Sequence, residues 1–151
     1  MDLIEALGKI GFTRHEATLY ITLCQEGELT GYEAAKISGL PRSNVYLALA
    51  GLVEKGGAYL CEGEVARYTP VPIEELVANT RRQTDEVLIY LEKQIPKKKI
   101  SVEPYVTITG KTQIVNKMKN IIDQAKERIY LSFAPGELEL VMNELEAAVA
   151  R

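Results

Sequence analysis

A pair of short helices joined by a tight turn is the feature of this sequence that most constrains its fold. Thr30 and Glu33 have the spacing of a capping box, in which each side chain satisfies the other residue's free backbone N–H, so a helix is predicted to begin here. Gly39 is expected to end that helix, and Leu40-Pro41 to form the turn. The next helix is predicted from about Arg42 to Lys55, because one apolar stripe has helical spacing: Val45, Ala48, Leu49 and Leu52. Two helices connected in this way indicate a helix-turn-helix.

Further helices are predicted before this pair, and a β-hairpin after it. Asp2 to Lys9 has helical apolar spacing, and a second capping box at Thr13 and Glu16 opens another helix. After Gly56-Gly57 the apolar period becomes that of strands, so two strands are expected to pair: Ala58–Cys61 and Val65–Val71. Gly63 is expected to supply the positive φ of a tight turn between them. Short helices followed by a hairpin are the order of a winged helix-turn-helix domain, which we assign to residues 1–72.

A long helix is predicted from Ile73 to about Gln94, opened by Pro72 and halted by Pro96. Its seam positions alternate at spacings of four and three, the pattern of a coiled coil: Ile73, Val77, Thr80, Thr84, Val87 and Leu91. We expect residues 73–99, which end in a basic linker, to join two copies of the chain into a homodimer. The alternative is a helix that packs along its own domain.

The last third of the chain, residues 100–151, changes structural class. Strands are predicted at Val102–Thr109 and Arg128–Phe133, each followed by a helix with apolar periodicity. This β-α-β-α order indicates a parallel sheet, and two strands alone do not make a stable one. The predicted fold class is therefore mainly α, with a winged helix-turn-helix domain, a long dimerisation helix and a partial α/β C-terminal segment.

The start of the helix after the turn carries the residues that best fit DNA. In a helix-turn-helix the second helix enters the major groove, and here its first turns are expected to expose four polar residues: Arg42, Ser43, Asn44 and Tyr46. Arginine can bond guanine O6 and N7, asparagine can bond adenine N6 and N7, and serine and tyrosine can reach phosphates. Lys36 and Arg67 are expected to flank this face, Arg67 from the wing. The alternative is a polar first turn that only caps a core helix.

Charge and composition limit the other functions. Residues 1–72 hold more acidic than basic residues, and the net charge of the chain is −3, so DNA binding requires the basic residues to gather on one face. Cys24 and Cys61 are far apart, which argues against a metal or redox site, and Cys24 is expected to be buried. The single histidine, His15, has no identifiable partner for a catalytic dyad. No enzyme activity, cofactor or metal is therefore predicted.

The sequence also argues against a membrane protein. No apolar run approaches the ~20 residues that a membrane-spanning helix needs. The first residues lack the basic-then-apolar layout of a signal peptide. A cytoplasmic protein without a membrane partner is expected.

Several runs of residues resemble the TrmB-type sugar-responsive transcriptional regulators. Gly11 to Tyr20 looks like the family's opening LG-x-T-x-x-E-A-x-x-Y, and Gly39 to Tyr46 resembles its recognition-helix signature GVPRSxVY. Arg67-Tyr68 with Pro70-Val71-Pro72 resembles the end of the wing and the entry to the long helix. The signature of the recognition helix continues with Leu49, Leu52, Lys55 and Gly56. The resemblance extends from near the start of the chain to its end.

This resemblance implies DNA-facing positions at Arg42, Ser43, Asn44 and Tyr46, a wing position at Arg67, and a dimerising coiled coil in the long helix. The segment from Val106 to Arg151 resembles the start of the family's effector domain, which has a phospholipase-D-like fold and senses sugars. Leu47 and Ala50 depart from the family, which more usually has charged residues there. Since this region ends after two strand–helix units, we expect a fragment or a naturally shortened chain.

The predicted function is a sequence-specific DNA-binding transcriptional regulator, ligand-responsive in its full-length form. The expected partners are double-stranded DNA, a second copy of the chain, and a sugar or other small-molecule effector. Two copies would face successive major grooves about one turn, ~34 Å, apart. The alternative is a protein-interaction or dimerisation module with a winged-helix scaffold and no specific DNA binding. A third possibility is small-molecule binding at the loop from Ser132 to Gly136.

Overall fold

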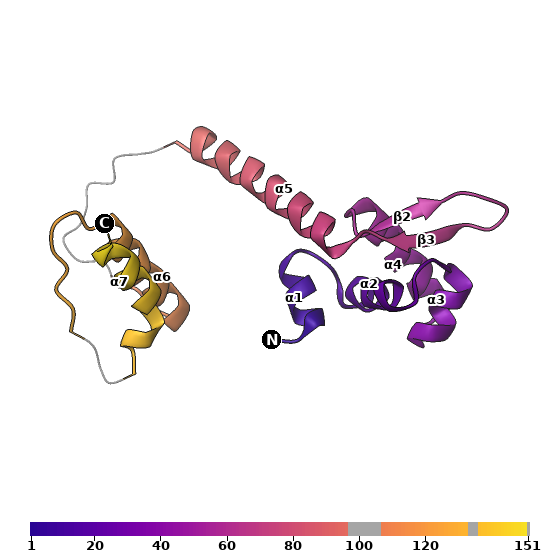
Figure 1. The fold of residues 1–151 in the computed structure, drawn as a ribbon, viewed down its shortest axis with the longest axis horizontal. Coiled ribbons are helices and arrows are strands. Elements are labelled where there is room, and N and C mark those ends of the chain that lie inside the picture. Colours follow the sequence, from indigo (N-terminus) through magenta and orange to yellow (C-terminus); the bar gives the residue numbers. More distant parts are fainter. Residues whose placement is uncertain (97–106, 133–135, 151) are drawn as a thin grey trace. The chain divides into compact units, whose positions relative to one another are not determined.

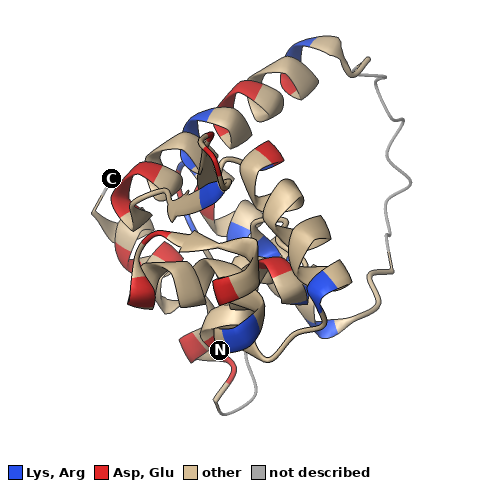
Figure 2. Ribbon diagram, turned by 90° about the vertical axis from the view of Figure 1, so that its right-hand side faces the viewer, with Lys and Arg blue, Asp and Glu red and all other residues tan. Residues whose placement is uncertain are grey.

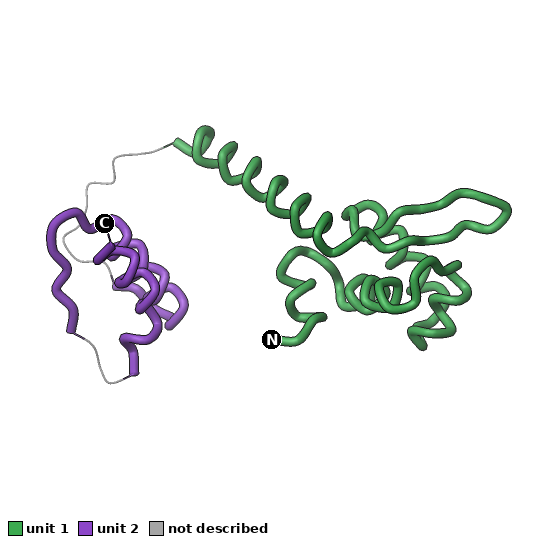
Figure 3. Tube along the Cα trace, in the orientation of Figure 1, with its two compact units in different colours: residues 1–97 green, residues 98–151 purple. Residues whose placement is uncertain are grey.

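The computed structural model describes residues 1–96, 107–132 and 136–150. These residues form two compact units, Met1–Lys97 (unit 1) and Lys98–Arg151 (unit 2), which are coloured separately in Figure 3. Among the described residues, no helix combines the length and the apolar character needed to cross a bilayer.

Unit 1 begins with four short helices, as Figure 1 shows: α1 (Leu3–Lys9), α2 (Arg14–Glu26), α3 (Gly31–Ser38) and α4 (Arg42–Glu54). Both predicted capping boxes are present. The Thr13 hydroxyl accepts the Glu16 N–H at 3.3 Å while Glu16 accepts the Thr13 N–H at 2.7 Å. Thr30 and Glu33 repeat this arrangement at the start of α3. The prediction of the helix-turn-helix, with α4 beginning at Arg42, is therefore confirmed.

A small antiparallel sheet completes the winged-helix fold: β1 (Leu29–Thr30), β2 (Ala58–Cys61) and β3 (Arg67–Pro70), in the order β1-β3-β2. The bounds of β2 match the prediction, but the return strand is shorter than expected and β1 was not predicted at all. The expected positive φ at Gly63 is wrong, because the hairpin is joined by the longer loop 62–66 and Gly63 is not among the glycines with positive φ.

The core of unit 1 lies between α2 and α4. Leu19 and Leu23 of α2 and Leu49 and Leu52 of α4 are completely buried. Complete burial of a leucine side chain contributes about 1.5–3 kcal/mol, so this contact fixes the α4 backbone from behind. The expectation of a buried Cys24 is wrong, since Cys24 is exposed on α2. Leu23, its neighbour in sequence, takes the interior position of that turn.

A buried carboxylate connects the first turn of α2 to the end of α4. Glu16 is 6% exposed and accepts a hydrogen bond from Lys55 Nζ at 2.6 Å, while the same Nζ also donates to the Gly11 carbonyl at 2.9 Å. Burial alone raises the pKa of Glu16, but the bonds from Lys55 and Thr13 outweigh it and hold the pKa below its usual value. Gly51 of α4 leaves room for this carboxylate, since a methyl group on Gly51 would collide with Glu16 Oε1.

The long helix α5 runs from Ile73 to Gln94, as predicted. Its entry is held by Val71, whose N–H donates to the Gly57 carbonyl at 3.0 Å and whose carbonyl accepts the Tyr20 hydroxyl at 2.9 Å. Leu76 is the only α5 residue that is buried, so the first turn docks on the domain and most of the remaining helix is exposed.

Unit 2 contains α6 (Lys111–Gln124), a 3-10 turn η1 (Leu138–Val141) and α7 (Met142–Val149). Lys119 Nζ pairs with Glu144 Oε1 at 2.7 Å, which links α6 to α7. Both predicted helices are present, whereas the two strands are not found among the described residues. Residues 107–109 and 128–132 form no strand, and the rest of both predicted strands lies outside the described residues. A strand needs a neighbouring strand to satisfy its backbone, and the described part of unit 2 offers none.

Candidate nucleic-acid interface

The first turns of α4 form the candidate interface. Arg42 and Ser43 are exposed, and Asn44 is half-buried. The helix begins after Pro41, which gives no side-chain cap, so the first N–H groups of α4 are not bonded by a capping side chain. The opposite face of α4 carries the stripe that packs into the core, led by Val45 with no exposed surface. The predicted outward presentation of this helix start is therefore present in the fold.

Arg42 is positioned by an aromatic ring from the neighbouring helix. Its guanidinium carbon lies 4.7 Å from the centroid of the Tyr32 ring, within the range of a cation–π interaction. Tyr32 is 54% exposed, so the pair stands at the surface with the guanidinium N–H groups available. Tyr32 was not predicted as a site residue, because its place in the first turn of α3, ten residues before Arg42, gives no local signal for this contact.

Tyr46 also lies against the start of α3. A methyl group on Gly31 would collide with Cε1 of the Tyr46 ring and come within 2.8 Å of its Cζ, so glycine allows the ring to sit close to the α3 backbone. Tyr46 still exposes 52% of its surface. The α3–α4 surface thus carries two exposed aromatic rings, of which Tyr32 contacts the Arg42 guanidinium and Tyr46 lies against Gly31. Ser43 is exposed in the same turn of α4 as Arg42.

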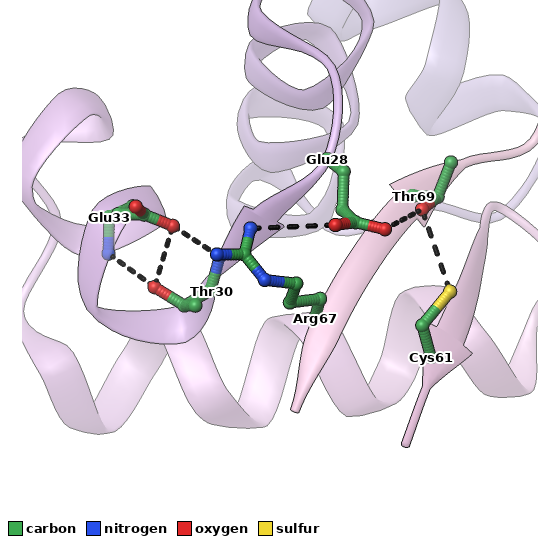
Figure 4. A network of polar contacts seen from close by, with 6 residues as sticks. All are labelled: Glu28, Thr30, Glu33, Cys61, Arg67 and Thr69. Atoms are coloured by element: carbon green, nitrogen blue, oxygen red, sulfur yellow. Dashed lines mark hydrogen bonds and ion pairs between the residues drawn. The ribbon is translucent and has the colours of Figure 1, made fainter. Parts of the chain in front are cut away.

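Arg67, the predicted wing residue, is engaged in an acidic network shown in Figure 4. Its Nη1 lies 3.4 Å from Glu28 Oε1, and the other oxygen of Glu28 accepts from the Thr69 hydroxyl at 3.4 Å. Hydrogen bonds from Thr30 hold the pKa of Glu33 below its usual value, and the positive charge of Arg67 acts in the same direction. Arg67 is therefore neutralised in this structure, although half of its side chain remains exposed.

The charge distribution agrees with the acidic composition. Figure 2 shows acidic and basic residues interspersed over the ribbon. Of the basic residues in 1–72, three have an acidic partner: Lys9, Lys55 and Arg67. In the part of the chain that the structure describes, Arg14, Lys36 and Arg42 form no ion pair. Lys36 lies in the last turn of α3 and is exposed, so two unneutralised cations come from the helix-turn-helix itself.

The centre of the exposed α4 face is apolar. Leu47 is 77% exposed and Ala50 is exposed one turn later, at the two positions where the resemblance leads one to expect charge. Polar groups on this face therefore lie at its two ends, with Arg42 and Ser43 in the first turn and the acidic Glu54 in the last.

The six predicted dimerisation residues all lie on α5. Four are exposed apolar residues: Ile73, Val77, Val87 and Leu91. Thr80 is half-buried and Thr84 exposed, and the Thr84 hydroxyl donates to the Thr80 carbonyl at 2.8 Å, so the hydroxyl of Thr84 has a partner within its own helix. Within the ranges that the structure describes, there is no cluster of three or more His, Cys, Asp or Glu residues suited to a metal ion.

Comparisons with known proteins bear on this interface. Residues 7–74 match the family model described as sugar-specific transcriptional regulator TrmB. The chain is 35% identical over 150 residues to the uncharacterized protein YrhO of Bacillus subtilis (strain 168), covering 97% of this chain and 54% of that protein. It is 26% identical over 150 residues to the HTH-type sugar sensing transcriptional regulator TrmBL1 of Pyrococcus furiosus, covering 96% of this chain and 44% of that protein.

A third relative is the DNA-binding HTH-type transcriptional repressor TrmBL2 of Thermococcus kodakarensis, with 29% identity over 137 residues, 78% of this chain and 51% of that protein. The chain therefore spans about half the length of the curated relatives that it matches.

Proposed function

Since the chain belongs, through residues 7–74, to the TrmB-type regulator family, we propose that it is a transcriptional regulator that binds specific sequences of double-stranded DNA. The observation that carries this proposal is the exposed start of α4, where Arg42 stands over Tyr32 with no acidic partner among the described residues. A guanidinium held in this way can make the bidentate bond to guanine O6 and N7 in the major groove. Two of the relatives are named as a transcriptional regulator and a DNA-binding repressor, which supports the same function.

The other predicted residues take supporting roles in this proposal. Ser43 and Tyr46 reach phosphates beside the groove, and Asn44, which is half-buried, offers its amide to an adenine edge. Lys36 supplies a phosphate contact from α3. Arg67 reaches DNA only after it exchanges Glu28 for a phosphate. Because residues 1–72 hold more acidic than basic residues, base contacts and dimerisation contribute more of the affinity for DNA than general attraction to phosphates does.

We further propose that α5 pairs two copies of the chain. Helices in proteins gain most of their stability from packing of an amphipathic face, and only Leu76 of the 22 residues of α5 is buried. The exposed apolar seam therefore needs a covering partner, and a second copy presents the same seam. Near the start of the seam, a hollow of about 310 Å³ between the end of α1 and α5 is lined by Ile10, Val77 and Thr80, and it offers a place for a partner side chain.

We propose that the response to a small molecule is a property of the full-length protein. One relative is named as sugar sensing, so a sugar is the effector class that we propose. The loop predicted to bind a ligand, Ser132 to Gly136, falls mostly outside the described residues.

Selection from a random DNA pool, repeated at two salt concentrations, tests the proposed function. The full chain should enrich one pseudo-palindromic sequence at both concentrations, and Arg42→Ala should weaken binding to it by about 1–3 kcal/mol and relax the preference at one base pair. Arg14→Ala is the matched control, since Arg14 is exposed and also unpaired but lies near the Lys55 end of α4. Enrichment of no sequence, together with equal binding by both variants, would leave a protein-interaction module as the better account of this acidic domain.

A further inference from the structure

The exposed face of α4 has an apolar centre that the proposed polar contacts do not use. Leu47 follows Ser43 by four residues and precedes Ala50 by three, so these residues lie along one side of the helix. That side is opposite the buried stripe, in which Leu49 and Leu52 have no exposed surface. Leu47 itself is 77% exposed. A single exposed leucine is ordinary on a protein surface, but this one projects from the middle of the helix proposed to enter the major groove.

We propose that Leu47 is a specificity-determining residue that contacts the C5-methyl group of a thymine. This inference rests on the proposed function of α4 as the recognition helix. Among the base-edge groups in the major groove, the thymine methyl is the one that an apolar side chain can select, because the others are hydrogen-bond donors and acceptors. The leucine side chain has neither a hydrogen-bond donor nor an acceptor. It therefore favours thymine, because contact between the side chain and the C5-methyl group removes apolar surface from water.

The position of Leu47 on α4 also defines where this thymine lies. Four residues of helix correspond to a rise of about 6 Å, so Leu47 is that far along the axis from Ser43. Base pairs are spaced by about 3.4 Å along the duplex. The thymine is therefore expected within about two base pairs of the base pair nearest Ser43 and Arg42. Small, exposed Ala50 leaves space beside the leucine for the methyl group to enter.

The test replaces each thymine of the selected site with deoxyuridine, one position at a time, which removes only the C5-methyl group. Kd is measured by fluorescence anisotropy for the full chain at one fixed salt concentration. At one thymine in each half-site, deoxyuridine should weaken binding about fourfold, the effect of about one buried methyl-sized group. Leu47→Ala should bind the thymine and deoxyuridine sites equally at that position. Leu3→Ala is the matched control, because Leu3 is 69% exposed on α1 and its variant should keep the fourfold difference.

The possible failures can be told apart. If the wild-type chain binds its selected site but distinguishes no deoxyuridine from thymine, the role of Leu47 is overturned and DNA binding stands. The same conclusion follows if Leu47→Ala keeps full sensitivity at the same thymine. If the chain selects no DNA sequence, the proposed function fails, and the role of Leu47 fails with it.

Discussion

Gly51→Ala should destabilise the winged-helix domain, although helix propensity alone predicts the reverse. Glycine inside a helix is about 1 kcal/mol less favourable than alanine, and Gly51 lies in the interior of α4. In this structure, however, a methyl group on Gly51 would overlap Glu16 Oε1 and approach Glu16 Cδ to 3.2 Å. The carboxylate must therefore move, and it is the acceptor for both Lys55 Nζ at 2.6 Å and the Thr13 N–H at 2.7 Å.

The size of the effect follows from the two bonds. A hydrogen bond to a charged group contributes about 1.5–3 kcal/mol, and the lower end applies to the bond from Lys55, whose side chain is 36% exposed. Loss of one or both bonds costs about 2–4 kcal/mol, so after the gain in propensity the net loss in free energy of unfolding is about 1–3 kcal/mol. In a Glu16→Ala background the obstruction is gone, and Gly51→Ala should then stabilise the domain by about 1 kcal/mol.

Urea unfolding of the full chain, followed by circular dichroism at pH 7, measures this double-mutant cycle. The amide signals of Leu49 and Leu52, which are fully buried in α4, assign the transition to unit 1 by NMR. The expected result is a change of sign: a loss in the wild-type background and a gain in the Glu16→Ala background. Equal stabilisation by Gly51→Ala in both backgrounds would show that Glu16 does not occupy the space beside Gly51.

Three further predictions concern charge, pH and assembly. Glu28→Gln should free Arg67 for a phosphate and steepen the log Kd–log salt relation by about 0.9; an unchanged slope in anisotropy titrations would mean that Arg67 does not reach DNA. Because the folded pKa of Glu16 is lowered from its ordinary value of 4.5, its contribution to stability is present above about that pH and lost as the pH falls through the folded value. The urea midpoint of unfolding should therefore fall less steeply with decreasing pH for Glu16→Gln than for the wild type. An equal decrease in both proteins would contradict this prediction. Replacement of Val87 and Leu91 by aspartate should give folded monomers in sedimentation, whereas a persistent dimer would place the interface elsewhere.

Local sequence signals were sufficient for most of the first unit. The capping boxes at Thr13 and Thr30 predict the starts of α2 and α3, because a cap involves only residues three positions apart. The stripe from Val45 to Leu52 predicts which face of α4 is buried, and therefore which face is exposed. The same signals placed α5 correctly, from Ile73 to Gln94.

Features that depend on distant residues could not be predicted in this way. The two residues of β1 become a strand only because they pair with β3, and the ion pair between Glu28 and Arg67 joins positions 39 residues apart. The contact of Arg42 with Tyr32 depends on how α3 and α4 cross. For Cys24, periodicity could not decide which of two adjacent apolar positions faces the core, and Leu23 occupies it. The strand predicted at 128–133 has apolar residues of the right type, but residues 128–132 have no strand beside them in the described part of unit 2.

The bonds at Val71 have a mechanical consequence for any signal that travels along α5. Both backbone polar groups of this residue are taken, by Gly57 and by the Tyr20 hydroxyl, and Leu76 anchors the following turn in the core. The junction between β3 and α5 is therefore held rigidly and does not act as a hinge. If two copies pair through α5 as proposed, a rotation of the paired helices would turn each winged helix with its α5 and would displace each Arg42 relative to the bound DNA.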